Sequence, residues 1–192
     1  MSKTVLYMSM SLDGFMAGPN VRDDNGLGDG GPRLHEWVFP PEGEVNTRVV
    51  AEFMATGAVV AGRGTFEPAG GWDGDHHDGV PIWVLSRNPD PEWAGRWPRV
   101  HSTDDVGEAF RAARDAAGDR DVLVHGATVA QLAIRTGLLD EMEIHLVPVL
   151  FGGGRRLFEH LGVGQRELER VRVLAGDGGV THLRYRLASD PS

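Results

Sequence analysis

The sequence predicts an α/β fold in which a mainly parallel central sheet is covered by helices on both faces and ends in an antiparallel hairpin. Short apolar runs of strand character alternate along the chain with stretches of helical spacing, as in β-α-β units. Residues 167–188 instead form two alternating runs on either side of a turn, Gly176-Asp177-Gly178-Gly179, which indicates a hairpin. With 192 residues and 41% hydrophobic content, the chain suits a single domain spanning residues 1–192.

The N-terminal part supplies a strand, a long loop and a helix. The apolar run from Thr4 to Met10 predicts a buried strand, whereas residues 20–43 are rich in Gly, Pro and Asp and predict a long loop. Loops of this length in a compact domain are often functional. Apolar side chains at helical spacing predict a helix over residues 44–56, and Gly57 fits its end.

The rest of the chain alternates strands with helices. Strands are expected at residues 58–62, 81–87, 100–102 and 121–126, and from 141 to the glycine turn at 152–154. Helices are expected at residues 105–117 and 128–137, with a short helical piece at 155–161. Thr103 or Asp104 is expected to cap the helix at 105–117.

Composition excludes several classes of function. The chain has 19 Lys and Arg against 28 Asp and Glu, a net charge of −9, which argues against non-specific binding to nucleic acid or to an anionic membrane. It has no cysteine, no apolar stretch long enough to span a membrane, and no long apolar segment of a signal peptide near its start. We therefore expect a cytoplasmic enzyme or binding protein that acts on a small molecule.

Glycine, arginine and hydroxyl side chains follow three of the expected strands. The segments are Gly62-Arg63-Gly64-Thr65, Ser86-Arg87 and Gly126-Ala127-Thr128. Ligands of open parallel sheets bind beyond the carboxyl ends of the strands, where helix N-termini offer free N–H groups to phosphates. None of the segments is the Gly-x-Gly-x-x-Gly pattern, and each alone also fits an ordinary strand-to-helix connection. Their agreement at three strand ends predicts a site for an anionic ligand.

The segment "GATVAQLAIRTGLLDEMEIHLVPVLFGGGRRLFE" at 126–159 resembles the C-terminal reductase domain of the bifunctional riboflavin-biosynthesis deaminase-reductase. The stretches "MSLDGFMAG", "VVAGRGTFE" and "PIWVLSR" fit this family in the expected order, so the resemblance covers nearly the whole chain. It implies the three-layer dihydrofolate reductase-like fold, binding of NADPH and hydride transfer. Because the chain has no cysteine, the zinc-ligand motif of the deaminase half is absent and we expect a stand-alone reductase-like domain.

Carried over motif by motif, the resemblance implies which residues contact NADPH. The cofactor phosphates would lie at Gly62, Arg63 and Thr65. The 2′-phosphate and adenosine ribose would lie at Ser86 and Arg87, favouring NADP over NAD. The residues expected around the pyrophosphate are Gly126, Ala127, Thr128, Val129 and Ala130. Those expected to line the nicotinamide are Ser9, Met16, Ala17 and Gly18.

The proton donor of the reduction has three candidates, Asp13, His125 and Glu44. Dihydrofolate reductases use a carboxylate on the helix before the "VVAGR"-like strand; counting back from Gly62 reaches Asn46, with Glu44 two residues earlier. Asparagine cannot protonate a substrate. Asp13 either contacts substrate or water or simply forms the "LDG" turn, and His125 either faces the cleft or is a structural histidine beside the sheet.

The leading hypothesis is an NADPH-dependent reductase resembling 5-amino-6-(5-phosphoribosylamino)uracil reductase. The alternatives are dihydrofolate reductase itself and a non-catalytic NADP-binding module. Arg155 and Arg156 either hold a substrate phosphate or begin a solvated helix. The loop "WDGDHHDG" at 72–79 is expected to be solvated rather than to bind a metal. The exposed hairpin and the apolar strand at 142–151 suggest a homodimer, as the family does.

Overall fold

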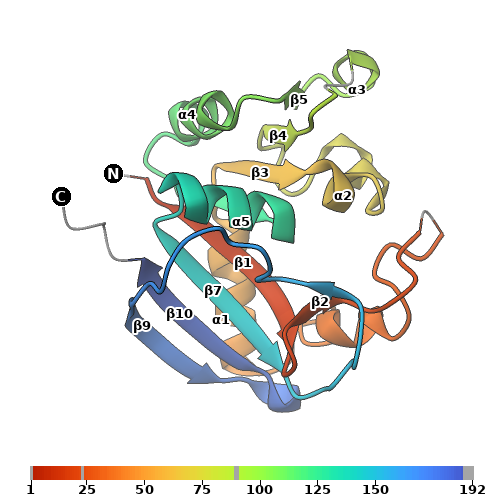
Figure 1. The fold of residues 1–192 in the computed structure, drawn as a ribbon, viewed down its shortest axis with the longest axis vertical. Coiled ribbons are helices and arrows are strands. Elements are labelled where there is room, and N and C mark those ends of the chain that lie inside the picture. The colour runs from red at the N-terminus through yellow and green to blue at the C-terminus, as the bar shows by residue number, and fades with distance from the viewer. Residues whose placement is uncertain (1, 23, 89–90, 188–192) are drawn as a thin grey trace.

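A computed structural model describes residues 2–22, 24–88 and 91–187, which form one twisted sheet with helices on both faces (Figure 1). The eight strands, in their order across the sheet, are β5 (Val100–Thr103), β4 (Ile82–Leu85), β3 (Ala58–Gly62), β6 (Val122–His125), β1 (Thr4–Ser11), β7 (Glu141–Val147), β10 (Thr181–Leu187) and β9 (Leu168–Ala175). The strands from β5 to β7 run parallel to one another. Strand β10 runs antiparallel to both of its neighbours, β7 and β9. The predicted α/β fold with a C-terminal hairpin is confirmed; Ala188, its last predicted residue, lies outside the described residues.

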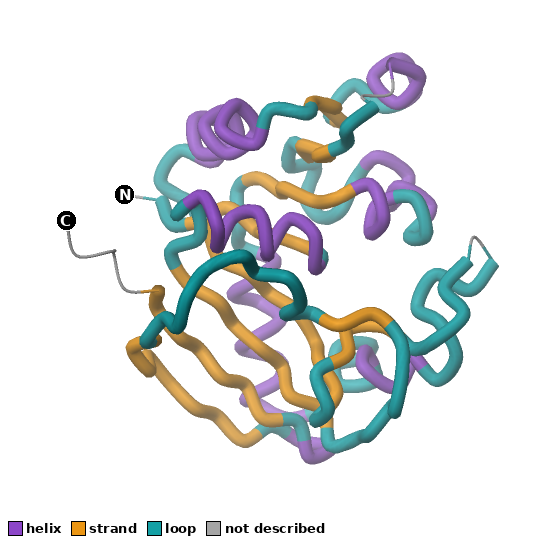
Figure 2. Tube along the Cα trace, viewed as in Figure 1, coloured by secondary structure: helices purple, strands orange, loops and turns teal. Residues whose placement is uncertain are grey.

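The centre of the sheet is buried on both sides. In β1, Val5 and Leu6 point to opposite faces and both are 0% exposed, which is why this strand reads as a continuous apolar run rather than an alternating one. The helices α4 (Val106–Ala117) and α5 (Ala127–Thr136) cover the face of Leu6. Helix α1 (Gly43–Met54) covers the face of Val5 (Figures 1 and 2).

The N-cap of helix α4 lies one or two residues after the positions predicted for it. The N-cap is Asp105, whose carboxylate accepts a hydrogen bond from the backbone N–H of Glu108 at 2.9 Å. The prediction of Thr103 or Asp104 as the cap is therefore wrong. Thr103 instead accepts from the backbone N–H of Asp105 through its hydroxyl, which places it just outside the helix.

A second, two-stranded sheet lies beyond the carboxyl end of β1. It pairs β2 (Phe15–Ala17) with β8 (Arg155–Arg156) in antiparallel orientation. The helical piece predicted at 155–161 is wrong, because the first two residues pair as a strand and the backbone of His160 has a positive φ of 51°, which no helix tolerates. The short helices are α2 (Arg63–Phe66), α3 (Pro91–Arg96) and the 3₁₀ turns η1 (Gly31–His35), η2 (Gly70–Gly74) and η3 (Asp177–Gly179).

The loop at 20–43 is folded against the body of the protein. It contains η1, and its side chains Leu34, Trp37 and Val38 are all at most 6% exposed. They pack with Val49 of α1 and with Val147 at the end of β7. The long loop therefore covers the carboxyl ends of the central strands on the α1 side.

The loop at 72–79 is not the solvated segment that the sequence predicted. His77 is 4% exposed, and its Nε2 lies 3.1 Å from the hydroxyl of Thr56. The ring of His76 packs edge-on against Trp72, with centroids 4.6 Å apart. Imidazole rings bury well against aromatic faces when their nitrogens find partners, and this outweighs the acidic composition of the loop. Within the described ranges, no three His, Asp or Glu side chains are arranged to hold a metal ion.

The free edge of the sheet on the side of the C-terminal hairpin is not β7. The apolar strand at 142–151, one of the two features that suggested a homodimer, is mostly β7, which lies between β1 and β10 inside the sheet. The free edge on that side is β9 instead.

Of the helices in the described part of the chain, none combines the length and the apolar character needed to cross a membrane.

Candidate cofactor and substrate site

The turns after β3 and β6 meet at the carboxyl edge of the sheet. These strands are neighbours, and Ala61 pairs with His125 at their ends. A Cβ on Gly126 would overlap the hydroxyl oxygen of Thr65, and a Cβ on Gly62 would lie 3.2 Å from the side chain of Val129. Gly126 also has φ 101° and ψ 150°, a conformation that only glycine adopts readily. The close approach of the two turns therefore requires glycine at 126 and leaves little room for a side chain at 62.

The first turn of α5 presents backbone amides rather than side chains. Ala127, Val129 and Ala130 are buried in the core, and only Thr128 among the expected pyrophosphate contacts has an exposed side chain. Gly126 provides no side-chain cap, so the first N–H groups of this ten-residue helix have no intrahelical acceptor. A dinucleotide diphosphate fits such a turn because free N–H groups and the helix dipole favour an anion.

Ala127 directly follows Gly126 in the turn after β6. Among the described residues the one cis peptide bond is Phe39–Pro40, so the Gly126–Ala127 bond is trans. Ala127 takes its place as the first residue of α5, and its methyl group is 5% exposed. Gly126 alone adopts the unusual backbone conformation that this turn requires.

The turn after β4 lies at the same edge, beside β3. The hydroxyl of Ser86 donates to the backbone carbonyl of Asn88 at 2.8 Å and shapes the turn, while Arg87 is exposed. Arg63 at the start of α2 forms an ion pair with Glu67 at 2.8 Å. Of the two arginines expected near cofactor phosphates, Arg63 is thus already neutralised by a carboxylate of its own helix.

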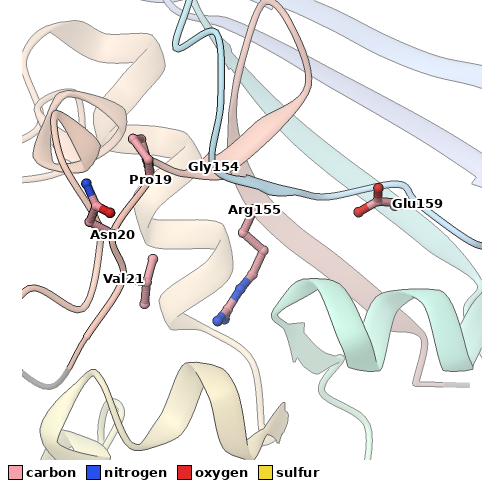
Figure 3. A pocket seen from close by; sticks show the side chains of 7 residues that line it. Pro19, Asn20, Val21, Gly154, Arg155 and Glu159 are labelled. Carbon is pink, nitrogen blue, oxygen red and sulfur yellow. The ribbon is translucent and has the colours of Figure 1, made fainter.

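The residues expected at the nicotinamide lie on β1 and β2. Ser9 is 6% exposed and its hydroxyl accepts a hydrogen bond from the indole N–H of Trp37 at 3.0 Å. Met16 and Ala17 are buried, and Met16 packs in the same cluster as Ala127 of α5. Gly18 opens onto a groove of about 500 Å³, shown in Figure 3, whose other lining residues are Pro19, Asn20, Val21, Gly154, Arg155 and Glu159.

Asp13 holds two loops together. Its carboxylate accepts hydrogen bonds from the backbone N–H groups of Phe151 and Gly152, the latter at 2.7 Å, and from the hydroxyl of Ser11 at 2.6 Å. The Ser11 hydroxyl and the two backbone amides lower the pKa of Asp13 to about 2. The group is therefore ionised at neutral pH, where it accepts hydrogen bonds and has no proton to donate.

His125 ends β6 immediately before the glycine turn. Its ring lies 5.9 Å from Trp72 and 5.6 Å from His76, and its buried Nδ1 has no hydrogen-bond partner among the described residues. Burial, and then the proximity of His35, lower the pKa of His125 to about 4, although a hydrogen bond to the Tyr7 carbonyl opposes this. The ring is neutral at pH 7, so one of its two nitrogens carries a free lone pair.

Glu44 does not join these groups. It lies in the first turn of α1 with its side chain exposed, and no hydrogen bond or ion pair links it to the described residues. Asn46, one of the positions considered for the proton donor, is 1% exposed instead. Its amide donates to the Asp177 carbonyl at 3.2 Å and its oxygen lies 3.0 Å from Nε2 of His182.

A buried polar layer under α1 was missed by the sequence analysis. His145 of β7 lies beside His182 of β10, and the indole of Trp37 packs on both rings with centroids 4.3 and 4.8 Å away. Further along the same strands, Glu143 pairs with Arg172 and Arg184. Polar residues alternate with apolar ones in "EMEIHLV" and "THLRYRL". Once β7 and β10 pair, this alternation places Glu141 and Glu143 opposite arginines and His145 opposite His182.

Comparison with known proteins gives the family. The sequence matches the model of the RibD C-terminal domain over residues 2–182. No curated protein matches the sequence. A putative riboflavin biosynthesis protein from Shewanella sp. PV-4 shares 24% identity with a TM-score of 0.73, and the match covers 97% of this chain and 99% of that one.

Two further solved structures share the architecture. The diaminohydroxyphosphoribosylaminopyrimidine deaminase/5-amino-6-(5-phosphoribosylamino)uracil reductase of Thermotoga maritima has a TM-score of 0.63 at 16% identity, covering 97% of this chain and 57% of that one. A dihydrofolate reductase from Enterococcus faecalis, complexed with NADP(H) and RAB-propyl, has a TM-score of 0.61 at 18% identity, with 97% of both chains covered. The chain belongs to the RibD C-terminal domain family and has the fold of dihydrofolate reductase.

Proposed function

We propose that this protein is an NADPH-dependent reductase that transfers a hydride to a small heterocyclic, imine or carbonyl substrate. The first candidate is 5-amino-6-(5-phosphoribosylamino)uracil, the compound named for the Thermotoga maritima relative. One observation carries the proposal: the turns after β3 and β6 approach so closely that neither Gly62 nor Gly126 has ample room for a side chain. That approach leaves the first amides of α5 open beside Thr65, as a diphosphate requires.

The residues present fit a dinucleotide. Gly126 and the amides of α5 would bind the diphosphate, and Thr65 and Thr128 would add hydroxyl groups. Arg87, exposed at the end of β4, would bind the 2′-phosphate that distinguishes NADPH from NADH. Bound NADPH would supply the hydride, and the protein would position it.

The substrate side is assigned to Ser9 and His125. Ser9 lies two residues before the end of β1, and His125 ends the neighbouring strand β6, next to the proposed cofactor turn. The half-buried, neutral ring of His125 would contact the substrate and orient it. His125 would deliver a proton only after taking one up, whereas Asp13, ionised and bound by backbone amides, would hold the β1–β2 turn in place.

The test is to follow nicotinamide absorbance with NADPH and each of three substrate sets: the phosphoribosylaminouracil, dihydrofolate, and a panel of small carbonyl compounds. We expect consumption with the first or the third set and none with dihydrofolate, because Asn46 offers no acid. Turnover of dihydrofolate would instead identify a dihydrofolate reductase. Binding of NADPH without consumption across all sets would identify a non-catalytic NADP-binding module, and no binding would reject the proposal.

A further inference from the structure

Two neighbouring arginines on β8 point in opposite directions. The guanidinium of Arg156 lies over the ring of Phe15, 4.4 Å from its centroid, and donates to the backbone carbonyl of Asp13 at 3.2 Å. Arg155 extends to the other side of the strand, as alternating residues do. Figure 3 shows its side chain reaching away from Gly154 into the space between α2 and α5.

Arg155 makes a contact that does not neutralise it. Its Nη1 donates to the backbone carbonyl of Gly64 at 2.7 Å, and Gly64 leaves little room there, because a Cβ would lie 3.3 Å from that nitrogen. No carboxylate lies within ion-pair distance of Arg155 in the described ranges. Glu159 lines the same groove but lies at its far end in Figure 3, and its carboxylate is 3.6 Å from His160.

The guanidinium of Arg155 forms no ion pair with the described residues, although the chain as a whole carries a net charge of −9. Arg63, one residue before Gly64, is already paired with Glu67. The guanidinium of Arg155 thus has donors to spare in a groove that adjoins Gly18 and the turn of α2. A forked, permanently charged donor in this position matches a phosphate group better than a single neutral carbonyl.

We propose that Arg155 binds the diphosphate of the dinucleotide, exchanging the Gly64 carbonyl for phosphate oxygens when the cofactor enters. This inference rests on the proposed function and adds a contact from β8, outside the strand-end turns that hold the rest of the cofactor. Because Ala17 pairs with Arg155 in the small sheet, the contact joins the β1–β2 turn to the cofactor groove. The diphosphate is common to NADPH and NADH, so Arg155 serves both equally.

The experiment is calorimetric titration of the full chain with NADPH and with NADH, which needs no substrate. Arg155→Ala is expected to weaken both cofactors by the same factor, about tenfold or more, the loss typical of one charged hydrogen-bonding partner. Arg155→Lys should recover part of the loss, since it keeps the charge but not the fork. Arg156→Ala is the matched control and should leave both affinities unchanged, and thermal melting without cofactor checks that each variant folds.

The outcomes separate this inference from the proposed function. Unchanged affinities in Arg155→Ala, or equal losses in Arg156→Ala, would overturn the role of Arg155 while leaving the reductase proposal intact. A loss for NADPH alone would move Arg155 to the 2′-phosphate and overturn the diphosphate assignment. An unchanged affinity with a raised KM for a phosphorylated substrate would assign Arg155 to the substrate instead. If the unaltered protein binds neither cofactor, both proposals fail together.

Discussion

The Nδ1 atoms of His145 and His182 lie 2.9 Å apart in the buried layer between α1 and the sheet. At this distance one nitrogen donates a proton and the other accepts it, so the two rings cannot both carry a charge. With the amide N–H of Asn46 directed to the Asp177 carbonyl, its oxygen accepts from Nε2 of His182. His182 then offers a lone pair at Nδ1, and His145 donates to it.

This pair predicts a loss of stability in mild acid. Burial is the largest cause that lowers the pKa of His182 to about 4 and holds that of His145 well below its usual range of 6.5. The unfolded chain therefore binds more protons than the folded one below pH 6.5, and the free energy of unfolding falls as pH drops from 6.5 toward 4. Urea unfolding at intervals between pH 8 and pH 4.5 measures this slope.

A double variant, His145→Gln with His182→Gln, is the control for that slope. It should be less stable at pH 8 but lose less further stability on acidification, because two of the depressed histidines are gone. His125 and His76, whose pKa values burial also lowers, keep part of the slope in the variant. Parallel curves for the unaltered and double-variant proteins would contradict the assignment.

Replacing Glu143 is expected to lower the free energy of unfolding by a large amount. Its side chain is 0% exposed and lies 2.9 Å from Arg172 and 3.5 Å from Arg184, with Glu52 of α1 completing the network. Glu143→Ala removes a buried carboxylate and leaves two guanidinium groups short of a partner, which costs about 3–5 kcal/mol of unfolding free energy. The comparison by urea unfolding is with Glu169→Ala.

Glu169 makes a suitable control because it pairs with Arg186 at a similar distance, 2.8 Å, but is 64% exposed. Surface ion pairs contribute about 0–1 kcal/mol, so this variant should unfold near the unaltered protein. Equal losses in the two variants would show that burial does not set the strength of the Glu143 network.

Gly126→Ala tests the cofactor turn. The added methyl group would overlap Thr65, and alanine at φ 101° is strained, so we expect a loss of about 1–3 kcal/mol in stability together with weaker NADPH binding. Gly153→Ala is the matched control, since nothing lies within 4 Å of a Cβ there. Thermal melting with and without NADPH measures both effects, and a Gly126→Ala protein that melts and binds like the control would contradict the close approach.

Arg87→Ala tests cofactor choice. If Arg87 binds the 2′-phosphate, the variant should lose about tenfold in affinity for NADPH and little for NADH, because only NADPH carries that group. Arg63→Ala should have a smaller effect, since Glu67 already neutralises Arg63. Fluorescence titration with both cofactors measures the ratio, and equal losses for NADPH and NADH would remove the 2′-phosphate role.

The sequence was sufficient for the features that depend on local pattern. The strand ends at Gly62 and Gly126 were visible because glycine followed by a helical spacing marks a strand-to-helix turn, and the two turns do meet. The helix at 155–161 was wrong because "RRLFEHL" has a helical spacing, whereas pairing with β2, far away in sequence, decides its backbone.

The buried polar layer could not be derived without the pairing of the strands. Glu143 and Arg184 stand 41 residues apart and become neighbours only through the register of β7 with β10. The same register brings His145 opposite His182. In a strand, charged residues that alternate with apolar ones usually indicate a face exposed to solvent. Here helix α1 covers that face, so the charged residues are buried.

The free edge of the sheet predicts the oligomeric state. Strand β9 has no partner on its outer side among the described residues, and its side chains Leu168, Val171 and Val173 are 40–49% exposed. An eight-residue edge strand with exposed valines favours pairing with another strand, so we propose a homodimer through β9. Val173→Lys should shift sedimentation at micromolar concentration toward the monomer, because a charge at the pairing edge opposes association. Leu150→Lys, at a 70% exposed loop position outside β9, should leave the dimer intact, and a monomeric unaltered protein would reject the proposal.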